Sequence, residues 1–458
     1  MNPEKNILLF GAGKSATELI TFLIRACGQN QWRLIVVDAQ ADLVRAKTQD
    51  HPLTTAIGMD IQAETAQRLD LIRTAGVVIS MLPPALHQLI AADCLEAGAH
   101  LLTASYVDPS IRAMAPAIRE KGLLFLCEMG LDPGIDHMSA MRLVHAIREK
   151  GGQITAFYSH CGGLIAPESD DNPWHYKISW NPRNVVMAGI HGARFREDGV
   201  DKQISYENLF DPTRQISGPF AWYPNRDSLE YTTLYGLEDV PTFIRTTLRH
   251  PAFVSGWKNL IKLNLTDDTP AYDTTGMTQA GFFRAHCKRY GIDTALDYSR
   301  PLAEQLKKLL TISLEEATLL EKQLLCLGWN STDKVKFRRT ADDLIKLASA
   351  ADILQVILEC KLALKPEDKD MIVMRHEIRY AEGGGTRTLQ SNLVVKGHDA
   401  VHTAMARTVG LPLGIAAVLV MQDKLRLRGL QIPIVPEIYL PVLEELEKEG
   451  IVFDERVI

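Results

Sequence analysis

The first 127 residues alternate short apolar runs with longer amphipathic runs, and this alternation limits the possible folds more than any other feature of the chain. Strands are predicted at 6–10, 33–37, 53–57, 76–80, 99–102 and 123–127. Helical patterns lie between them, near 14–27, 41–48, 62–74, 84–97 and 110–121. Strands that alternate with helices are typical of parallel sheets, so the pattern predicts a doubly wound α/β domain with helices on both faces.

The rest of the chain follows a different pattern. A strand is predicted at 153–159, and the stretch 164–180 reads as the longest loop. Leucine and alanine then recur at helical spacing, which predicts helices at 301–310, 313–329 and 340–364. A hairpin is predicted at 368–397, with its turn at Gly383–Gly385. Further helices are expected near 399–409, 411–424 and 440–449.

Charge and cysteine content narrow the class of protein. The 458 residues include 50 Lys and Arg against 56 Asp and Glu, and a net charge of −6 argues against a nucleic-acid or anionic-membrane binder. The seven cysteines show no C-x-x-C spacing, which favours reduced thiols in a cytoplasmic protein. The N-terminus shows no signal-peptide pattern, and the longest apolar run, 411–421, is too short to span a membrane.

A glycine-rich turn joins the first predicted strand to the first predicted helix. Gly11, Gly13 and Ala16 fit the G-x-G-x-x-G/A pattern of dinucleotide-binding domains. The first glycine allows a tight turn, the second lets a pyrophosphate approach the backbone, and the small third residue lets helix and strand pack closely. The alternative is a P-loop around "GKS" at 13–15, but Leu8 stands where that motif requires glycine. The turn therefore predicts a nicotinamide dinucleotide site.

Asp38 ends the second predicted strand and bears on the choice of cofactor. A carboxylate at this place accepts hydrogen bonds from the adenosine ribose and repels a 2′-phosphate. No arginine follows directly in "VVDAQAD", so the sequence predicts NAD in preference to NADP. The alternative is a solvated acid at a strand end.

Polar residues also end the fourth and fifth predicted strands. Ser80, Met81 and Leu82 lie where the carboxyl end of a sheet strand meets a bound nicotinamide nucleotide. Ser105 and Tyr106 offer hydroxyl groups at the same edge. Taken singly, these residues are more often ordinary loop hydrogen-bonders.

Several motifs in fixed order resemble the saccharopine dehydrogenase family of the glutamate-forming type. They are "ASYVDP" (104–109), "GLDPGIDH" (130–137), "CGGLIAPESDDNP" (161–173), "YKISW" (176–180), "YPNRDS" (223–228), "TLRH" (247–250), "DKDMIVMRHEI" (368–378), "ARTVGLPLGIAAVLVM" (406–421) and "RGLQIPIVPEIYLPVLEELEKEGI" (428–451). The matching half of the bifunctional lysine-degrading enzymes of animals and plants is similar too. The resemblance covers nearly the whole chain and is weakest between about 270 and 365.

The resemblance implies three domains, an activity and an assembly. An NAD(P)-binding Rossmann domain at 1–130 is completed by about 399–458. A mixed α/β substrate and dimerisation domain comprises 131–272 and 366–398, and a helical domain is inserted at 273–365. The implied reaction interconverts saccharopine, NAD(P) and water with glutamate, allysine (2-aminoadipate semialdehyde) and NAD(P)H. A homodimer is implied, whereas the direction of the reaction in the cell stays open.

Saccharopine carries three carboxylates and a secondary amine, and the motifs supply groups for each. Arg226 and Arg249 match the substrate-contacting arginines of the family, since a guanidinium binds carboxylates bidentately. Asp132 is expected to bind or polarise the amine, with general base catalysis as a hypothesis, and Tyr106 is a second catalytic candidate. The same resemblance adds Ser105, Thr247 and Leu248 to the substrate site, and Leu131, Cys161, Gly162 and Gly163 to the cofactor site. Lys14 and Ser15 lie where the first turn departs from the family pattern, and they could contact the pyrophosphate or face solvent.

Each of these residues also has a simpler interpretation. The arginines could form surface ion pairs, and Asp132 could cap a helix at 134–149 with Pro133 in its first turn. Lys177 could orient carboxylates or the cofactor, or it could lie on the surface. Cys161 is expected to pack rather than act as a nucleophile, and no metal is expected. The acids of the 164–180 loop, Glu168, Asp170 and Asp171, are expected to be solvated or hydrogen-bonded. Asp136 and His137 are expected to support the site residues from behind or to lie at the start of the helix.

Two other functions stay open. One is a related imine-reducing dehydrogenase that acts on a polyamine or carboxynorspermidine-type substrate, whose cationic nitrogens would favour an acidic pocket. The other is a catalytically silent NAD-binding sensor, which would keep the glycine-rich turn without needing the substrate motifs.

Overall fold

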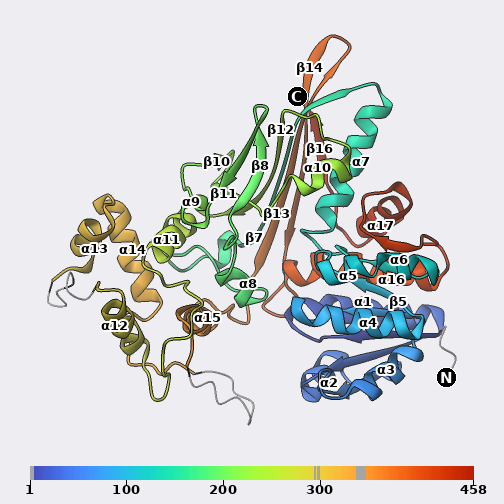
Figure 1. Ribbon diagram of the computed structural model, residues 1–458, viewed down its shortest axis with the longest axis horizontal. Coiled ribbons are helices and arrows are strands. Elements are labelled where there is room, and N and C mark those ends of the chain that lie inside the picture. Colours follow the sequence, from blue (N-terminus) through green and yellow to red (C-terminus); the bar gives the residue numbers. More distant parts are fainter. Residues whose placement is uncertain (1–4, 293–295, 297–299, 337–346) are drawn as a thin grey trace. The chain divides into compact units, whose positions relative to one another are not determined.

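The computed structural model describes residues 5–292, 296, 300–336 and 347–458, which divide into two compact units (Figure 1). Unit 1 comprises Met1–Cys161, Thr233–Glu238 and Met374–Ile458, and unit 2 comprises Gly162–Thr232 and Asp239–Val373. The three-domain division at 1–130, 131–272 and 273–365 stays a prediction.

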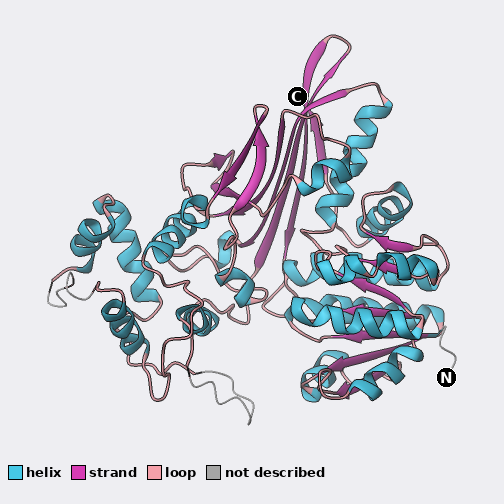
Figure 2. Cartoon of the chain, in the orientation of Figure 1, coloured by secondary structure: helices cyan, strands magenta, loops and turns pink. Residues whose placement is uncertain are grey.

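Unit 1 contains a seven-stranded parallel sheet with the strand order β15-β6-β5-β4-β1-β2-β3 (Figure 2). The strands are β1 (Asn6–Phe10), β2 (Arg33–Asp38), β3 (Thr54–Gly58), β4 (Val77–Ser80), β5 (His100–Thr103), β6 (Leu124–Leu126) and β15 (Gly429–Gln431). The predicted α/β class is confirmed, and the first six strands lie where the apolar runs predict them. Strand β15 was not predicted, because three residues are too few to show a periodic pattern.

Helices lie on both faces of this sheet (Figure 1). They are α1 (Thr17–Asn30), α2 (Ala41–Thr48), α3 (Thr65–Arg73), α4 (His87–Ala97), α5 (Pro109–Ala113) and α6 (Ala115–Glu120). Helix α1 packs against α2, whereas α3 packs against α4, and α4 against α5. The predicted helix 110–121 is two helices, because Pro116 in the first turn of α6 has no N–H to continue the hydrogen-bond ladder.

The C-terminal residues add two helices to unit 1, α16 (Ala404–Met421) and α17 (Pro436–Lys448). The two helices predicted near 399–409 and 411–424 are therefore a single helix, α16, which contains Pro412. By length and composition alone α16 could cross a membrane, but 72% of it is buried within the protein. Gly410 and Gly414 pack closely against Leu19 and Phe22 of α1, which accounts for the apolar composition.

A second sheet includes the strand that follows helix α7 (Ile135–Glu149) and a long hairpin nearer the C-terminus. Strands β7 (Gln153–Ile165) and β13 (Asp370–Glu382) each contribute residues to both units, and β14 (Gly385–Lys396) and β16 (Asp454–Val457) lie in unit 1. The predicted hairpin turn is confirmed, because Gly383 and Gly384 both have a positive φ between β13 and β14.

Unit 2 combines antiparallel strands with helices. Its strands are β8 (Ala193–Glu197), β9 (Val200–Ile204), β10 (Gln215–Ile216), β11 (Phe220–Pro224) and β12 (Thr242–Arg249). Its helices are α8 (Pro182–Val186), α9 (Tyr206–Leu209), α11 (Pro251–Lys262), α12 (Gln279–Arg289), α13 (Leu302–Leu310), α14 (Leu314–Cys326) and α15 (Ala350–Lys361), and α10 (Glu230–Tyr235) crosses the division. Phe253 and Trp257 stack in its core, and Trp174 contacts both rings edge-on. The first part of the helix predicted at 340–364, residues 340–346, lies outside the described residues. Within the described part, Ser349 caps α15.

Candidate active site

The glycine-rich turn after β1 has the geometry that a dinucleotide needs. Gly11 has φ +99°, and a Cβ there would lie 2.7 Å from the Met81 carbonyl oxygen, so the turn tolerates only glycine. A Cβ on Gly13, by contrast, would meet no atom within 4 Å, so the backbone is open to a ligand on that side. Lys14 is exposed on the same turn, and Ala16 is buried against the sheet. The residues present therefore fit a pyrophosphate at this turn.

Asp38 connects the glycine-rich turn to the end of β2. Its Oδ2 accepts the Ala12 amide hydrogen at 2.8 Å, and its Oδ1 accepts the Gln40 amide hydrogen at 3.0 Å. Asp38 is therefore bonded to the glycine-rich turn at Ala12 and to the chain just after β2 at Gln40.

Sequence reasoning missed a histidine that joins the ends of β4 and β5. His87 Nδ1 lies 2.7 Å from Ser80 Oγ, and His87 Nε2 lies 2.7 Å from Ser105 Oγ. Burial lowers the pKa of His87 to about 4, although the negative charge of Asp108 acts in the opposite direction. The ring is therefore neutral near pH 7, with one nitrogen donating and the other accepting. The two predicted site serines thus belong to one hydrogen-bonded chain.

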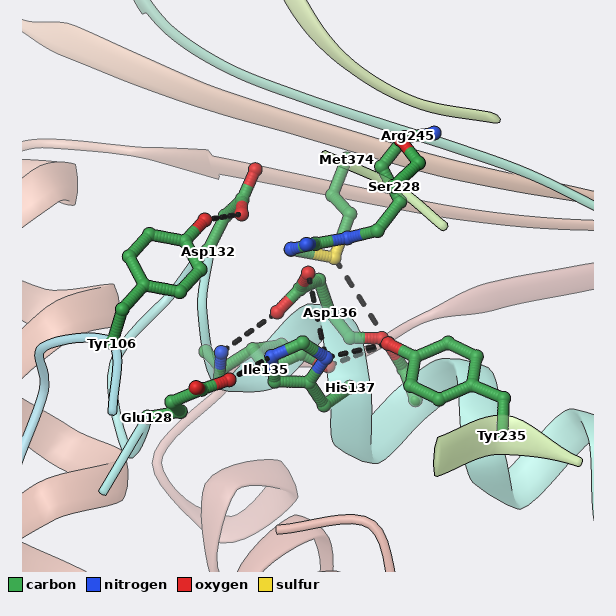
Figure 3. Close-up of polar contacts among 12 residues, drawn as sticks. Tyr106, Glu128, Asp132, Ile135, Asp136, His137, Ser228, Tyr235, Arg245 and Met374 are labelled. Carbon is green, nitrogen blue, oxygen red and sulfur yellow. Dashed lines mark hydrogen bonds and ion pairs between the residues drawn. The ribbon is translucent and has the colours of Figure 1, made fainter. Parts of the chain in front are cut away.

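Tyr106 and Asp132 lie together just beyond β5 and β6 (Figure 3). The Tyr106 hydroxyl donates to Asp132 Oδ1 at 3.2 Å, and both side chains are half-buried. The hydrogen bond from the phenol fixes the direction of the carboxylate. The structure therefore brings together the two residues for which catalytic roles were predicted.

Asp132 does not cap helix α7, which corrects that alternative. The helix begins at Ile135, and Gly134 before it has φ +147°, which is not helical, so Pro133 is not in the first turn. No side-chain capping hydrogen bond forms at the start of α7, where Asp136 Oδ1 accepts the Gly134 amide hydrogen at 2.7 Å. Asp136, four residues after Asp132, is therefore the acid that contacts this backbone amide.

Glu128, which was not predicted, belongs to a buried hydrogen-bonded chain near Tyr106 and Asp132 (Figure 3). Glu128 Oε1 accepts the Val107 amide hydrogen at 3.2 Å, and Oε2 lies 2.9 Å from His137 Nε2. His137 Nδ1 in turn contacts the Tyr235 hydroxyl. Glu128 thus fixes the backbone next to Tyr106. The sequence offered one indication of Glu128, because it follows β6 (Leu124–Leu126) just as other candidate residues follow strands of the same sheet.

Within unit 2, the predicted glycines and Leu248 lie at the close contact between β7 and β12. A Cβ on Gly162 would lie 2.6 Å from the Leu248 carbonyl oxygen, so this glycine lets the chain approach itself. The Leu248 side chain is fully buried in a small apolar cluster. Thr247 and Gly163 are half-buried, and in unit 1 Leu131 and Cys161 are buried. Their substrate and cofactor roles stay predictions.

Arg249 is buried rather than exposed, so the surface ion-pair alternative is wrong for it. Its Nη1 donates to the Leu248 carbonyl at 2.8 Å, and its guanidinium stacks 5.2 Å from the Tyr176 ring centroid and 5.7 Å from that of Phe253. Its Nε is buried without a hydrogen-bond partner. Arg226, by contrast, is exposed at a turn where it has φ 52°, and its predicted clamp role stays a prediction.

The loop at 164–180 contains an ion-pair network of its own. Lys177 is buried, and its Nζ lies 2.6 Å from Asp368 Oδ2 and 2.9 Å from Asp171 Oδ1. The surface alternative for Lys177 is therefore wrong, and carboxylates of the protein already engage its ammonium. Asp170 lies 2.6 Å from His175 Nδ1. Among the described residues, no group of three or more His, Cys, Asp or Glu side chains could hold a metal ion.

Two family models match consecutive parts of the chain. One, described as the saccharopine dehydrogenase NADP binding domain, matches residues 7–126, and the other, described as the saccharopine dehydrogenase C-terminal domain, matches residues 130–451.

Curated relatives match over the full chain. It is 32% identical over 492 residues to alpha-aminoadipic semialdehyde synthase of Arabidopsis thaliana, covering 100% of this chain and 45% of that protein. It is 31% identical over 463 residues to the Saccharomyces cerevisiae saccharopine dehydrogenase named NADP(+), L-glutamate-forming, covering 99% of both. The chain spans about half the length of the plant and mammalian relatives it matches.

A solved structure has the same fold. The apo histidine-tagged saccharopine dehydrogenase (L-Glu forming) from Saccharomyces cerevisiae matches with a TM-score of 0.82 and 28% sequence identity. The match covers 99% of this chain and 100% of that one.

These comparisons correct the cofactor prediction. The sequence predicts NAD because of Asp38, but the matching family model is described as NADP-binding, and the fungal relatives are named NADP(+)-dependent. The prediction is wrong because it considered one carboxylate without its surroundings, whereas the charge around the turn also depends on residues of other elements.

Proposed function

We propose that this chain, which belongs to the saccharopine dehydrogenase family, is an NADP-dependent oxidoreductase that acts on saccharopine in lysine metabolism. In this reaction saccharopine, NADP+ and water are interconverted with glutamate, 2-aminoadipate semialdehyde and NADPH. Full-length similarity to a relative named for this reaction supports the proposal. So does the order of the quoted motifs along the chain.

The observation that carries the choice of substrate is the buried guanidinium of Arg249. A buried cation needs compensation, and no carboxylate of the described chain forms an ion pair with it. A substrate with three carboxylates supplies the missing anion, and the unsatisfied Nε–H adds a donor for it. A polyamine-type substrate would instead place more positive charge against this arginine.

Asp132 and Tyr106 are proposed to manage the proton of the substrate amine. Bound NADP+ would supply the acceptor for a hydride from the carbon that bears this amine. The amine must lose its proton before that hydride leaves, so the Asp132 carboxylate holds the ammonium and accepts the proton. The Tyr106 hydroxyl keeps the carboxylate oriented through its 3.2 Å hydrogen bond. Glu128 acts as a positioning residue, because it fixes the Val107 backbone beside Tyr106.

The purified chain is tested with saccharopine and NADP+, with the near-ultraviolet absorbance of NADPH as the signal. Glutamate and the semialdehyde are then identified by mass spectrometry, and the reverse reaction starts from both with NADPH. The same assay with a polyamine-type substrate is the control. A folded chain that binds NADP but turns over no saccharopine in either direction would contradict the proposal.

We further propose a homodimer in the cytoplasm. The dimer is an implication of the family resemblance, and light scattering of the purified chain tests it. The location is supported by the seven cysteines, which form no disulfides in the described structure, and it is tested by fractionation of the source cells. The mouse relative is named as mitochondrial, so fractionation includes that compartment.

A further inference from the structure

Lys47 places a cation against the glycine-rich turn from a different element. It lies on α2, and its Nζ donates to the Gly13 carbonyl and, at 2.9 Å, to the Thr17 hydroxyl. The side chain is half-buried. Both partners are neutral, and no carboxylate of the described chain lies within 4.0 Å of the ammonium. Such a cation at the rim of a cofactor turn is ready to bind an anion.

The surroundings of Lys47 show that its charge is poorly compensated. Burial lowers the pKa of Lys47 to about 8, and the nearby negative charge of Asp38 opposes this shift. The two charges are therefore close enough to interact. Asp38 itself is fixed by the amides of Ala12 and Gln40, so it cannot turn away from the adenosine end of the site.

This arrangement bears on how an NADP site tolerates Asp38. A fixed carboxylate at the end of β2 repels a phosphate on the ribose 2′-oxygen. A lysine held against the same turn cancels much of that repulsion and offers three donors to the phosphate oxygens.

We propose that Lys47 binds the 2′-phosphate of NADP and sets the preference of this chain for NADP over NAD. The inference rests on the proposed NADP-dependent function and names the residue that makes it possible in the presence of Asp38. The competing explanation is that Lys47 only holds α2 against the glycine-rich turn. That role would serve NAD and NADP equally, so the two explanations make different predictions.

The test compares ligands that differ only in the phosphate. Titration calorimetry measures the dissociation constants of 2′-AMP, 5′-AMP, NADP and NAD with the parent chain and with Lys47→Met, which keeps an apolar stem without the charge. We expect 2′-AMP and NADP to bind about 10- to 100-fold more weakly to Lys47→Met, the range of a lost charge-assisted hydrogen bond. Binding of 5′-AMP and NAD is expected to stay unchanged, and Lys47→Arg is expected to keep most of the preference.

Lys121→Met is the matched control. Lys121 is an exposed lysine of the same unit that also donates to a backbone carbonyl, that of Leu95, at 2.8 Å. This substitution should leave all four constants unchanged. If Lys47→Met weakens NADP and NAD binding equally, and 2′-AMP and 5′-AMP binding equally, the inference is overturned and Lys47 has a structural role. Unchanged constants would overturn it as well.

These measurements use no saccharopine, which separates this inference from the proposed activity. A chain that binds NADP through Lys47 but does not oxidise saccharopine would refute only the activity. Turnover of saccharopine together with an unchanged NADP to NAD ratio in Lys47→Met would refute only the role of Lys47.

Discussion

Replacing Arg249 by methionine tests most directly whether unit 2 binds a carboxylate substrate. The side chain is 4% exposed and stacks on two aromatic rings, and its Nε has no partner. Methionine keeps much of the apolar stem and removes the guanidinium. If that group holds a substrate carboxylate, the loss is one or two charged hydrogen bonds, each worth about 1.5–3 kcal/mol. The KM for saccharopine should therefore rise by about 10- to 100-fold or more.

The same substitution should change folding stability much less, and this contrast separates binding from structure. Removing the guanidinium loses the stacking on Tyr176 and Phe253, worth about 0.5–2 kcal/mol, and the bond to the Leu248 carbonyl. It also removes a buried unsatisfied N–H, which costs about 1–3 kcal/mol in the parent. These contributions oppose each other, so the free energy of unfolding should change little.

Steady-state kinetics and urea unfolding of the same preparation measure both effects. Arg249→Lys is the matched variant, since it keeps the charge but not the planar fork, and its KM should lie between those of parent and methionine variant. The dissociation constant of NADP should not change in either. An unchanged KM for saccharopine in Arg249→Met would refute the assignment, and a parallel collapse of stability and NADP binding would show a structural role instead.

Three other substitutions probe the cofactor unit. Asp132→Asn should lower kcat by at least about 100-fold with near-normal NADP binding, because the side-chain amide cannot accept the amine proton. Near-normal turnover of this variant across the pH range would exclude proton transfer by Asp132. Gly11→Ala should lose more than about 2 kcal/mol of stability and NADP binding, because its Cβ would lie 2.7 Å from the Met81 oxygen at a positive φ; a normal unfolding midpoint would contradict this. Because the pKa of His87 is low in the folded chain, the unfolded chain takes up a proton first as the pH falls. The parent should therefore lose about 3 kcal/mol of unfolding free energy as the pH falls from 6.5 towards about 4, and His87→Gln should lose less, which urea titrations at both pH values measure. Equal losses would argue that the ring is not buried in its neutral form.

Local patterns were sufficient for much of the cofactor unit. Short apolar runs predicted the first six strands, and strands such as β1, β2 and β4 read as continuous apolar runs because they are buried on both faces. Strand β3 at the edge of the sheet is only partly buried. Gly11 was predicted correctly as a residue of a tight turn, since the G-x-G-x-x-A spacing is itself a local backbone requirement. The family resemblance extended these predictions to unit 2, where no simple period predicts the short strands.

The site residues that were missed or corrected depend on backbone geometry and on contacts that spacing alone does not predict. Asp132 was a plausible helix cap by spacing, but the backbone at Gly134 leaves the helical region, and the Gly134 amide donates to Asp136. His87 was not predicted: it lies between Ser80 at the end of β4 and Ser105 just after β5, so its contacts depend on the pairing of these two strands in the sheet.

The sequence by itself therefore determined the class of fold, the position of the dinucleotide turn and the family, because each follows from short-range patterns or from motifs in order. The tertiary structure decided the protonation of His87, the burial of Arg249 and the charge balance between Asp38 and Lys47. Burial and charge compensation are set by every element packed around a group. A carboxylate that predicts NAD when considered alone is accompanied by a lysine from the next helix, and only the folded chain brings the two together.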